Sequence, residues 1–312
     1  QTAPKVGDVP SAEKWLANAV QAGLEPDIIS YTAVIDACAN AGEHELASKW
    51  LAGAVLKALQ PDIIAYNAVI NACAQAGEQA SAERWFENAL QAGVEPNIVT
   101  YNTMINACAK AAQPVLAEKW LEKAVHAGIR PNMVSYTSII DACVKAGEHI
   151  IAERWLRIAT EQGLEPNLEN YHLVIGACAD AGEHSLAGGW LANAVIAGLA
   201  PNIRSYTAVI RACAKAGEIA LAENWLASAT ESGLKPDMYT YNQLIIACAK
   251  AGEHLEAEKW LAEAVEQGLQ PTIVSYNAVI DACAQAGEYT AAGNWLANAV
   301  LEALEPDIVS YN

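Results

Sequence analysis

The chain has 312 residues, of which 53% are hydrophobic and 17% are charged, and its 36 acidic and 18 basic side chains give a formal net charge of −18. This composition is too apolar for a disordered chain. Polar residues or glycine interrupt every apolar stretch before the ~20 residues that a membrane span requires, and no basic-then-apolar leader opens the sequence. We therefore expect no membrane span and no targeting segment, and the acidity argues against nucleic-acid binding by bulk charge.

Four residue types recur with one period of 35 residues. Nine prolines, all nine tryptophans, all eight cysteines and nine of the eleven tyrosines follow it, in series that start at Pro26, Trp15, Cys38 and Tyr31. A shared period in rare residue types is the signature of a tandem-repeat protein. In chain order we predict a partial repeat with a second helix only in 1–27, eight complete repeats within 28–307, and the start of a further repeat in 308–312. The complete repeats are 28–62, 63–97, 98–132, 133–167, 168–202, 203–237, 238–272 and 273–307.

Each complete repeat is predicted to start with a helix that follows the proline. In 28–62 the spacing i, i+3, i+4 and i+7 places apolar side chains on one helical face, at Tyr31, Val34, Ile35 and Cys38. Gly42 is expected to end this first helix, because glycine readily adopts the left-handed conformation found there.

A second helix is predicted to begin at Glu43, where a carboxylate suits the positive helix start, and to end near Ala58. Its apolar face comprises Ala47, Trp50, Leu51, Ala54 and Val55. Helices this short are unstable alone in water. Each repeat should therefore be a two-helix hairpin that buries its apolar faces against neighbouring hairpins.

This repeat resembles that of the pentatricopeptide repeat family. The likeness lies in the 35-residue period, in Tyr-Asn or Tyr-Thr early in the first helix (Tyr101-Asn102 within Ile98–Ile105), in Ala-Gly-Glu between helices, and in the terminal Pro-Asn or Pro-Asp (Pro96-Asn97). It covers essentially the whole chain. The tetratricopeptide repeat is disfavoured because its unit is one residue shorter.

The resemblance implies an all-α, right-handed superhelical solenoid of antiparallel helix pairs. It also implies binding of single-stranded RNA with one base per repeat, in the mitochondrion or plastid, for RNA processing, stability, editing or translation. No cofactor and no small-molecule substrate are implied.

Two residues per repeat read the base in this family. The first reading residue follows the early tyrosine, and the second follows the terminal proline. Here the pairs are Thr32/Asp62, Asn67/Asn97, Asn102/Asn132, Thr137/Asn167, His172/Asn202, Thr207/Asp237, Asn242/Thr272 and Asn277/Asp307. The competing interpretation is that these residues are ordinary helix caps. Capping alone does not require them to vary between repeats, so base reading is the favoured role.

The second reading residue has a chemistry that suits particular bases. A carboxylate only accepts hydrogen bonds and suits the ring N–H of G or U, whereas an Asn amide can donate to the ring nitrogen of A or C. Together with the family's purine–pyrimidine rule for the first residue, the pairs imply 5′-G, C/U, C/U, A, unassigned, G, weak pyrimidine, U-3′. His172 leaves the fifth repeat unassigned, and Thr272 makes the seventh weakly selective.

The family also holds each base between side chains two residues before the tyrosine, which we call the sandwich positions. Those expected to serve here are Ile29, Ile64, Val99, Val134, Arg204, Tyr239, Val274 and Val309. Glu169 departs from the pattern because it should repel phosphate, while Arg204 and Tyr239 could still stack on a base. Lysines late in the first helices are candidate phosphate ligands: Lys110, Lys145, Lys215 and Lys250.

The acidity lies mostly outside the first helices. These helices contain six basic and five acidic residues, so an anionic strand could be tolerated along them. The basic residues are Arg204, Arg211, Lys110, Lys145, Lys215 and Lys250, and the acidic residues are Asp36, Asp141, Glu169, Asp180 and Asp281.

Several residue series look chemical but are expected to be structural. Each cysteine lies between small residues on the buried stripe, without a Cys-x-x-Cys motif, so buried thiols in a reducing compartment are expected rather than disulfides or metal ligands. The tryptophans are expected in the core. His44, His149, His184 and His254 recur one repeat or more apart and cannot surround one ion, so surface histidines and no metal site are expected. We find no catalytic constellation and expect no enzyme.

Two other functions remain open. A protein-binding or architectural subunit of a large organellar assembly would explain the net charge of −18 and the departures at Glu169, Arg204 and Tyr239. Alternatively, the chain could be the targeting arm of an enzyme whose catalytic domain lies outside this sequence.

Overall fold

A computed structural model describes residues 8–302 and 304, and in this part of the chain all regular structure is α-helical. Contacts divide the chain into two compact units, Gln1–Glu165 and Pro166–Asn312. The second reading residue Asp307, the sandwich residue Val309 and the repeat start in 308–312 lie outside the described residues.

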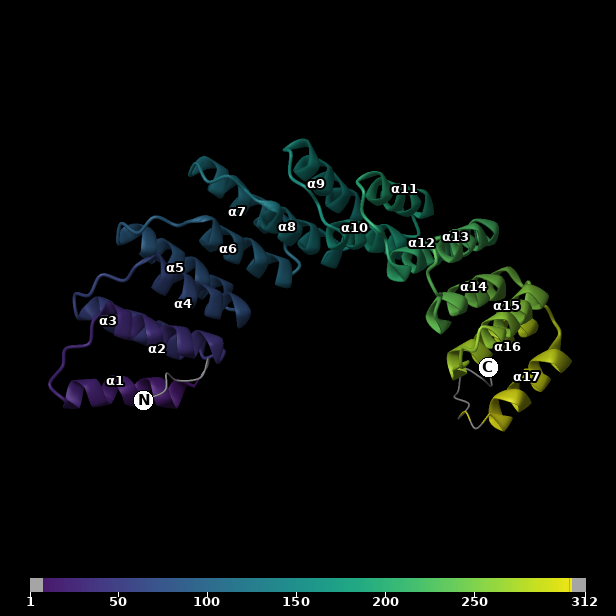
Figure 1. The fold of residues 1–312 in the computed structure, drawn as a ribbon, viewed down its shortest axis with the longest axis horizontal. Coiled ribbons are helices and arrows are strands. Elements are labelled where there is room, and N and C mark those ends of the chain that lie inside the picture. Colours follow the sequence, from purple (N-terminus) through teal and green to yellow (C-terminus); the bar gives the residue numbers. More distant parts are fainter. Residues whose placement is uncertain (1–7, 303, 305–312) are drawn as a thin grey trace. The chain divides into compact units, whose positions relative to one another are not determined.

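Nine helices of similar length form the first unit (Figure 1). They are α1 (Val9–Gln21), α2 (Ile28–Asn40), α3 (His44–Leu56), α4 (Ile63–Gln75), α5 (Gln79–Gln91), α6 (Ile98–Lys110), α7 (Pro114–His126), α8 (Met133–Lys145) and α9 (His149–Glu161).

Eight helices form the second unit in the described part of the chain. They are α10 (Leu168–Ala181), α11 (His184–Ile196), α12 (Ile203–Ala216), α13 (Ile219–Glu231), α14 (Met238–Ala251), α15 (His254–Glu266), α16 (Ile273–Gln285) and α17 (Tyr289–Leu301).

The first helix α2 has the predicted buried stripe. Its stripe residues Tyr31, Val34, Ile35 and Cys38 are all buried, which confirms the prediction. The helix starts because Asp27 Oδ1 accepts the backbone N–H of Ser30 at 2.9 Å. It ends where Gly42 has φ 79° and the N–H of Glu43 bonds to the carbonyl of Cys38 at 2.9 Å, a Schellman-type closure.

The second helix α3 buries a narrower face than the sequence predicted. Ala47, Leu51 and Ala54 are fully buried and Trp50 is half-buried, but Val55 is 47% exposed, so its predicted burial is wrong. Val55 lies at the edge of the apolar stripe, and the first helices against which α3 packs cover only the middle of that stripe. Glu43 precedes the helix without a side-chain cap, so its carboxylate contributes only by charge at the helix start.

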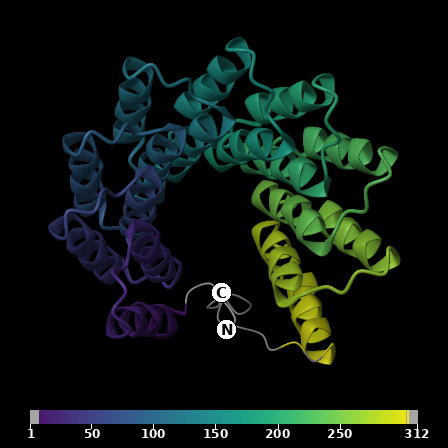
Figure 2. The same ribbon diagram turned by 60° about the vertical axis from the view of Figure 1, so that its left-hand side comes forward.

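The hairpins pack in two layers. In the first unit α2, α4, α6 and α8 contact one another in sequence, and in the second unit α10, α12, α14 and α16 do the same. Within each unit, a second helix packs on its own first helix and on the first helix that follows, wherever the unit has both in its described residues, as Figures 1 and 2 show. The core therefore runs along the first-helix layer, where each fully buried Val, Leu or Ile side chain contributes roughly 1.5–3 kcal/mol.

Aromatic pairs connect the two helices of each hairpin. The repeated tyrosine and tryptophan rings, as in Tyr31 and Trp50, have centroids 5.7–6.5 Å apart. Trp120, Trp155, Trp190 and Trp260 are buried as predicted. Trp15 is 46% exposed, because no described helix precedes α1 to cover it.

The cysteines and histidines occupy different environments. All eight cysteines are fully buried thiols, as predicted, and burial raises the pKa of Cys143 to about 12. The four recurring histidines are half-buried at the first positions of α3, α9, α11 and α15, not fully solvated as the sequence suggested.

No helix in the described part of the chain is long and apolar enough to cross a membrane.

Candidate nucleic-acid interface

The second reading residues are the N-caps of the first helices that follow them. Asp62 Oδ1 accepts the backbone N–H groups of Ile64 and Ala65, both at 3.1 Å, and Asn132 Oδ1 accepts that of Ser135 at 3.2 Å. The capping interpretation of these residues is therefore correct as far as it goes. A cap occupies only one side-chain oxygen, which leaves the second oxygen of Asp as an acceptor and the amide nitrogen of Asn as a donor.

The cap determines the orientation of the amide. Because Oδ1 of Asn132 must face the backbone N–H groups at the start of α8, Nδ2 is the atom that remains for another partner. Asp and Asn at the same site thus present opposite hydrogen-bonding character from the same backbone geometry. This gives a physical basis for expecting G or U opposite Asp, and A or C opposite Asn.

The first reading residues lie near the start of successive first helices. Six of them are half-buried: Thr32, Asn67, Asn102, Thr137, His172 and Asn277. Two are buried, Thr207 and Asn242, each at 7% exposure. None is scattered to a second helix, so within each unit the row is continuous along the layer of first helices.

Two of the proposed pairs are joined directly. Asn102 Nδ2 donates to Asn132 Oδ1 at 3.1 Å, and Asn67 Nδ2 lies 3.5 Å from Asn97 Oδ1. Each pair spans 30 residues of sequence, so the contact depends on the stacking of one repeat on the next.

The two reading residues of the sixth repeat, Thr207 and Asp237, are linked through the side chain of Thr240. Thr207 Oγ1 lies 2.7 Å from Thr240 Oγ1, which donates to Asp237 Oδ1 at 2.8 Å. In the first repeat, by contrast, the hydroxyl of Thr32 donates to the carbonyl of Ile28 within its own helix.

Asn167, the second reading residue of the fourth repeat, is the N-cap of α10. Its side chain is exposed, and Oδ1 accepts the backbone N–H of Asn170 at 3.1 Å. Asn170 Oδ1 in turn accepts the backbone N–H of Asn167 at 2.9 Å, which completes a capping box at the start of α10. The hydroxyl of Thr137, its expected partner, donates to the carbonyl of Met133 within α8. Asn167 is therefore a helix cap like the other second reading residues described above, and its reading of a base stays a prediction.

Asn202, the second reading residue of the fifth repeat, is a helix cap in the same way. It is exposed, and its Oδ1 caps α12 by accepting the backbone N–H of Ser205 at 3.3 Å. His172, its expected partner, has Nδ1 buried without a hydrogen-bond partner, so this nitrogen is not joined to Asn202. The structure thus gives Asn202 a capping role, and its reading of a base stays a prediction.

Thr272, the second reading residue of the seventh repeat, is also exposed at a helix start. Its backbone N–H donates to Ser275 Oγ at 3.1 Å, and the two hydroxyl oxygens lie 3.4 Å apart, in a capping box that begins α16. A hydroxyl engaged in this way can still donate or accept, which is consistent with the weak selectivity expected of this repeat.

The bridging hydroxyl before the early tyrosine is a functional position that sequence reasoning missed. Ser135 Oγ donates to Asn102 Oδ1 at 2.6 Å, and Thr100 Oγ1 donates to Asn67 Oδ1 at the same distance. Both hydroxyl residues are fully buried. The available signal was a polar residue on the otherwise apolar stripe, one position before every early tyrosine except Tyr66, which follows Ala65. These hydroxyls orient the amides of the first reading residues.

The apolar sandwich residues are exposed. Ile29, Ile64, Val99, Val134, Tyr239 and Val274 have exposed fractions from 52% to 74%. A single exposed apolar side chain needs no explanation, but a row of them beside hydrogen-bonding groups is typical of a binding surface. Arg204 and Glu169, at the same position of neighbouring repeats, are exposed as well.

The candidate phosphate lysines differ in their availability. Lys145 forms an ion pair of 2.6 Å with Asp141, and Lys215 Nζ contacts Asp180 through its carbonyl at 3.0 Å and its carboxylate at 3.8 Å. Ion pairing weakens Lys145 and Lys215 as phosphate ligands, because a phosphate must displace the carboxylate.

The other two candidate lysines lie in uncharged surroundings or at a helix end. Lys110 contacts Gln75 of the preceding first helix. Lys250 is exposed in the last turn of α14. Neither position contradicts contact with phosphate, so both stay predictions.

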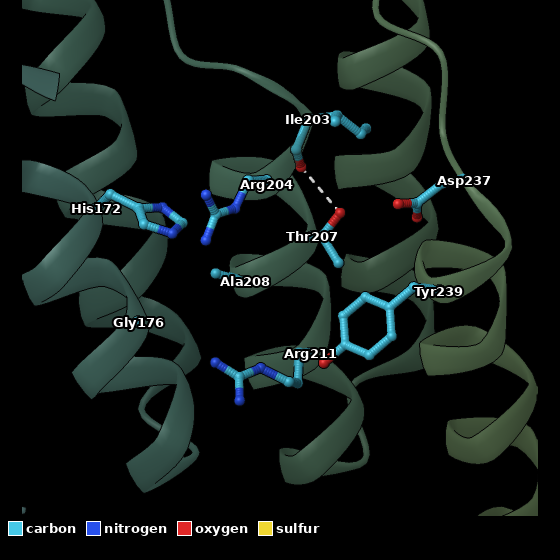
Figure 3. Close-up of a pocket in the computed structure, with 9 residues that line it drawn as sticks. All are labelled: His172, Gly176, Ile203, Arg204, Thr207, Ala208, Arg211, Asp237 and Tyr239. Atoms are coloured by element: carbon cyan, nitrogen blue, oxygen red, sulfur yellow. Dashed lines mark hydrogen bonds between the residues drawn. The ribbon is translucent and has the colours of Figure 1, made fainter. Parts of the chain in front are cut away.

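A pocket of about 410 Å³ opens between α10, α12 and the start of α14 in the second unit (Figure 3). Its walls are formed by His172, Gly176, Ile203, Arg204, Thr207, Ala208, Arg211, Asp237 and Tyr239. Burial, reinforced by the positive charges of Arg204 and Arg211 and opposed by Glu169, lowers the pKa of His172, so this imidazole is neutral near pH 7.

Stacked two-helix repeats, most of which place a polar pair beside an exposed apolar side chain, define an α-solenoid repeat protein with a periodic binding surface. The pentatricopeptide repeat domain model matches residues 14–53, 191–251, 225–286 and 259–312. The PPR repeat family model matches 61–110 and 96–145, and the PPR repeat model matches 134–164. The chain belongs to the pentatricopeptide repeat family.

Solved structures of the same fold include the pentatricopeptide repeat protein PPR10 from maize. It is 24% identical with a TM-score of 0.72, and the match covers 99% of this chain and 46% of that chain. The structure of PPR10 in complex with an 18-nt psaJ RNA element is similar, at 23% identity with a TM-score of 0.77, and covers 99% and 45%. The chain thus spans about half the length of these relatives. No curated protein sequence matches it.

Proposed function

We propose that this chain binds single-stranded RNA sequence-specifically, one base per repeat, and acts by binding rather than by catalysis. The observation that carries the proposal is the repeated combination of a capping second reading residue, a first reading residue in the row beside it, and an exposed apolar side chain. PPR10, which shares the fold, is known in complex with an RNA element. The family context supports a location in the mitochondrion or plastid, and we propose protein subunits of an organellar complex as further partners.

The third repeat shows how one base would be read. Asn132 keeps Oδ1 on the N-terminus of α8 and has Nδ2 available to donate to the ring nitrogen of cytosine. Val99 and Val134, both more than half exposed, lie at the two sandwich positions that would flank the base. Apolar contact on both faces and one hydrogen bond on the edge together select a base.

Selection of bound RNA from a random pool tests the proposal directly. We expect enrichment of an eight-nucleotide site that follows 5′-G, C/U, C/U, A, any base, G, pyrimidine, U-3′. Failure to enrich any sequence over the starting pool, with no RNA retained on filters, would support the architectural alternative instead.

The substitution Asn132→Asp tests the assignment of a single repeat. The carboxylate retains the cap oxygen on α8 but replaces a donor with an acceptor, so the third-position preference should change from C to U by about 1–3 kcal/mol, or roughly 5- to 150-fold. Competition binding with the two RNAs measures it. The matched control is Asn193→Asp, which makes the same charge change at an exposed site on the second helix α11 and should leave the preference unchanged.

A further inference from the structure

The fifth and sixth repeats depart from the others at three positions that face the pocket between α10 and α12. Gly176 stands where the first four repeats have Asp or Asn, and Arg211 is the one basic residue in that same row. Arg204 is likewise the one basic residue at a sandwich position. The pair His172/Asn202 has no assigned base. The fifth repeat, whose pair has no assigned base, thus borders the cavity that is lined by the two arginines.

The two arginines extend into one space. Arg204 and Arg211 are seven residues, or two helical turns, apart on α12, and both side chains reach toward α10 in Figure 3. The imidazole of His172 extends from α10 toward Arg204. Gly176 adds room, because a Cβ built there meets no atom within 4 Å. An aspartate in that row, as in the first and fourth repeats, would place a carboxylate beside the guanidinium groups.

The groups around the pocket are mostly hydrogen-bond donors. Two guanidinium groups donate only, and the neutral His172 can donate through Nδ1, which is buried without a partner. Arg211 shares the carboxylate of Asp180 with Lys215. In the described part of the chain no carboxylate forms an ion pair with Arg204. Glu169 and Asp237 are the other nearby acids, and they act near His172 and at the cap of α14 respectively.

A ligand that satisfies this donor set must be anionic and rich in acceptor oxygens. Guanidinium groups match phosphate geometry, because their N–H groups form parallel bonds to two phosphate oxygens. A base edge would use at most two of these donors and would supply no negative charge to Arg204, whose guanidinium forms no ion pair in the described residues, whereas a phosphate supplies one and competes with Asp180 for Arg211. The cavity of about 410 Å³ has ample room for a phosphate group.

We propose that the pocket formed by Arg204, Arg211, His172 and Gly176 binds a backbone phosphate of the RNA strand, so that the fifth repeat holds its nucleotide by the phosphodiester rather than by the base. This inference rests on the proposed RNA binding. It explains why the fifth repeat lacks a reading pair: a nucleotide held by its phosphate needs no base preference.

A scan of single methylphosphonate linkages along the selected RNA tests the proposal with the wild-type protein. A methylphosphonate removes one negative charge and leaves every base unchanged. We expect the dissociation constant to rise about tenfold or more at a linkage flanking the fifth nucleotide, in keeping with a lost charge-assisted hydrogen bond. The other linkages should show smaller effects. A flat scan, or a maximum at another repeat, would overturn the proposal.

Variants of the pocket identify the residues responsible. The double substitution Arg204→Gln with Arg211→Gln should weaken binding of unmodified RNA by the same factor and abolish the additional methylphosphonate effect. It should also reduce the slope of log K against log salt by about 0.7, the value for one phosphate contact on a single strand. Gly176→Asp should weaken binding by repulsion. The matched control, Arg84→Gln with Arg157→Gln on the second helices α5 and α9, should change none of these.

The outcomes separate this inference from the proposed function. If the wild-type protein binds no RNA, both fail. If it binds RNA with the expected base preferences but is insensitive to the modified linkage, only the phosphate site fails. If a free nucleoside monophosphate binds the pocket, loses affinity in the double variant and leaves the RNA scan flat, the site is a nucleotide site and the proposal is again overturned.

Discussion

Two alanines adopt a backbone conformation that most of the other repeats assign to glycine. Ala58, after α3, has φ 56°, and Ala112, after α6, has φ 52°. The equivalent turns elsewhere use glycines such as Gly93 and Gly147, at φ 72° and 75°. A left-handed conformation costs a residue with a Cβ roughly 1–2 kcal/mol. These two turns therefore carry strain that the sequence pattern of their neighbours would remove.

We expect Ala58→Gly and Ala112→Gly each to stabilise the folded chain by about 0.5–1 kcal/mol, which is the relieved strain less the entropy that glycine adds to the unfolded state. Thermal and urea denaturation followed by circular dichroism measure the change. Ala41→Gly is the control, because Ala41 has φ −82° and gains nothing from glycine. Equal effects at Ala58 and Ala41 would show that the left-handed turn is not strained.

Tryptophan side chains connect each of several second helices with the second helix that precedes it. Trp50 Nε1 donates to Glu13 at 3.1 Å and Trp295 Nε1 donates to Glu258 at 2.7 Å, in each case to the residue 37 positions earlier. For Trp225 that residue is Gly188, and the indole ring occupies the space of the missing side chain. A Cβ built on Gly188 comes within 2.9 Å of Cζ2 of Trp225. The packing of α11 against α13 therefore depends on this glycine.

Gly188→Ala should destabilise the chain by about 1–3 kcal/mol, because a rigid ring must shift within a packed interface. The adjacent substitution Gly189→Ala meets no atom within 4 Å and should stabilise α11 by about 0.5–1 kcal/mol through helix propensity alone. Denaturation midpoints of the two variants should therefore move in opposite directions. A stabilising Gly188→Ala would mean that the indole is not held against α11.

At the scale of the whole molecule, contacts are local along the chain. Every described first helix contacts its own second helix and the adjacent first helices of its unit, and the contacts form two compact units that divide at Glu165 and Pro166. In such an array stability is approximately a sum of repeat and nearest-neighbour terms. Neither unit depends on residues distant in sequence for its core.

Separate fragments of residues 1–165 and 166–312 should therefore each fold. We expect each to show the helical circular dichroism of the intact chain per residue and to unfold cooperatively, since each contains more than the three repeats that stacking requires. Size-exclusion chromatography and heat denaturation of the isolated fragments measure this. A fragment that remains unfolded would show that its stability comes from the other unit.

Much of the fold could be predicted because its causes are local. The stripe at Tyr31, Val34, Ile35 and Cys38, the turn at Gly42 and the burial of every cysteine follow from spacing within one repeat. Val55 was misplaced because periodicity identifies the direction of an apolar face but not how much of it a neighbour covers.

The candidate site could likewise be predicted from the sequence only in part. The capping roles of Asn167 and Asn202 can be predicted from the sequence, because a cap and its backbone partner are three residues apart. Whether such a cap also contacts the first reading residue of its repeat is not visible there, because that residue lies 30 positions away. Asn102 and Asn132 are joined by a hydrogen bond, whereas the hydroxyl of Thr137 donates within α8 and Nδ1 of His172 is buried without a hydrogen-bond partner.

Period and residue type along the chain were thus sufficient to predict the helices, the hairpins and the row of polar residues, because each depends on residues within about one helical turn of one another. Stacking alone decided that Ser135 orients Asn102 against Asn132, that Asp180 engages Lys215, and that Gly176 opens a cavity beside Arg204 and Arg211. These contacts join residues about 30 positions apart, and their distances are set by how closely one hairpin packs on the next.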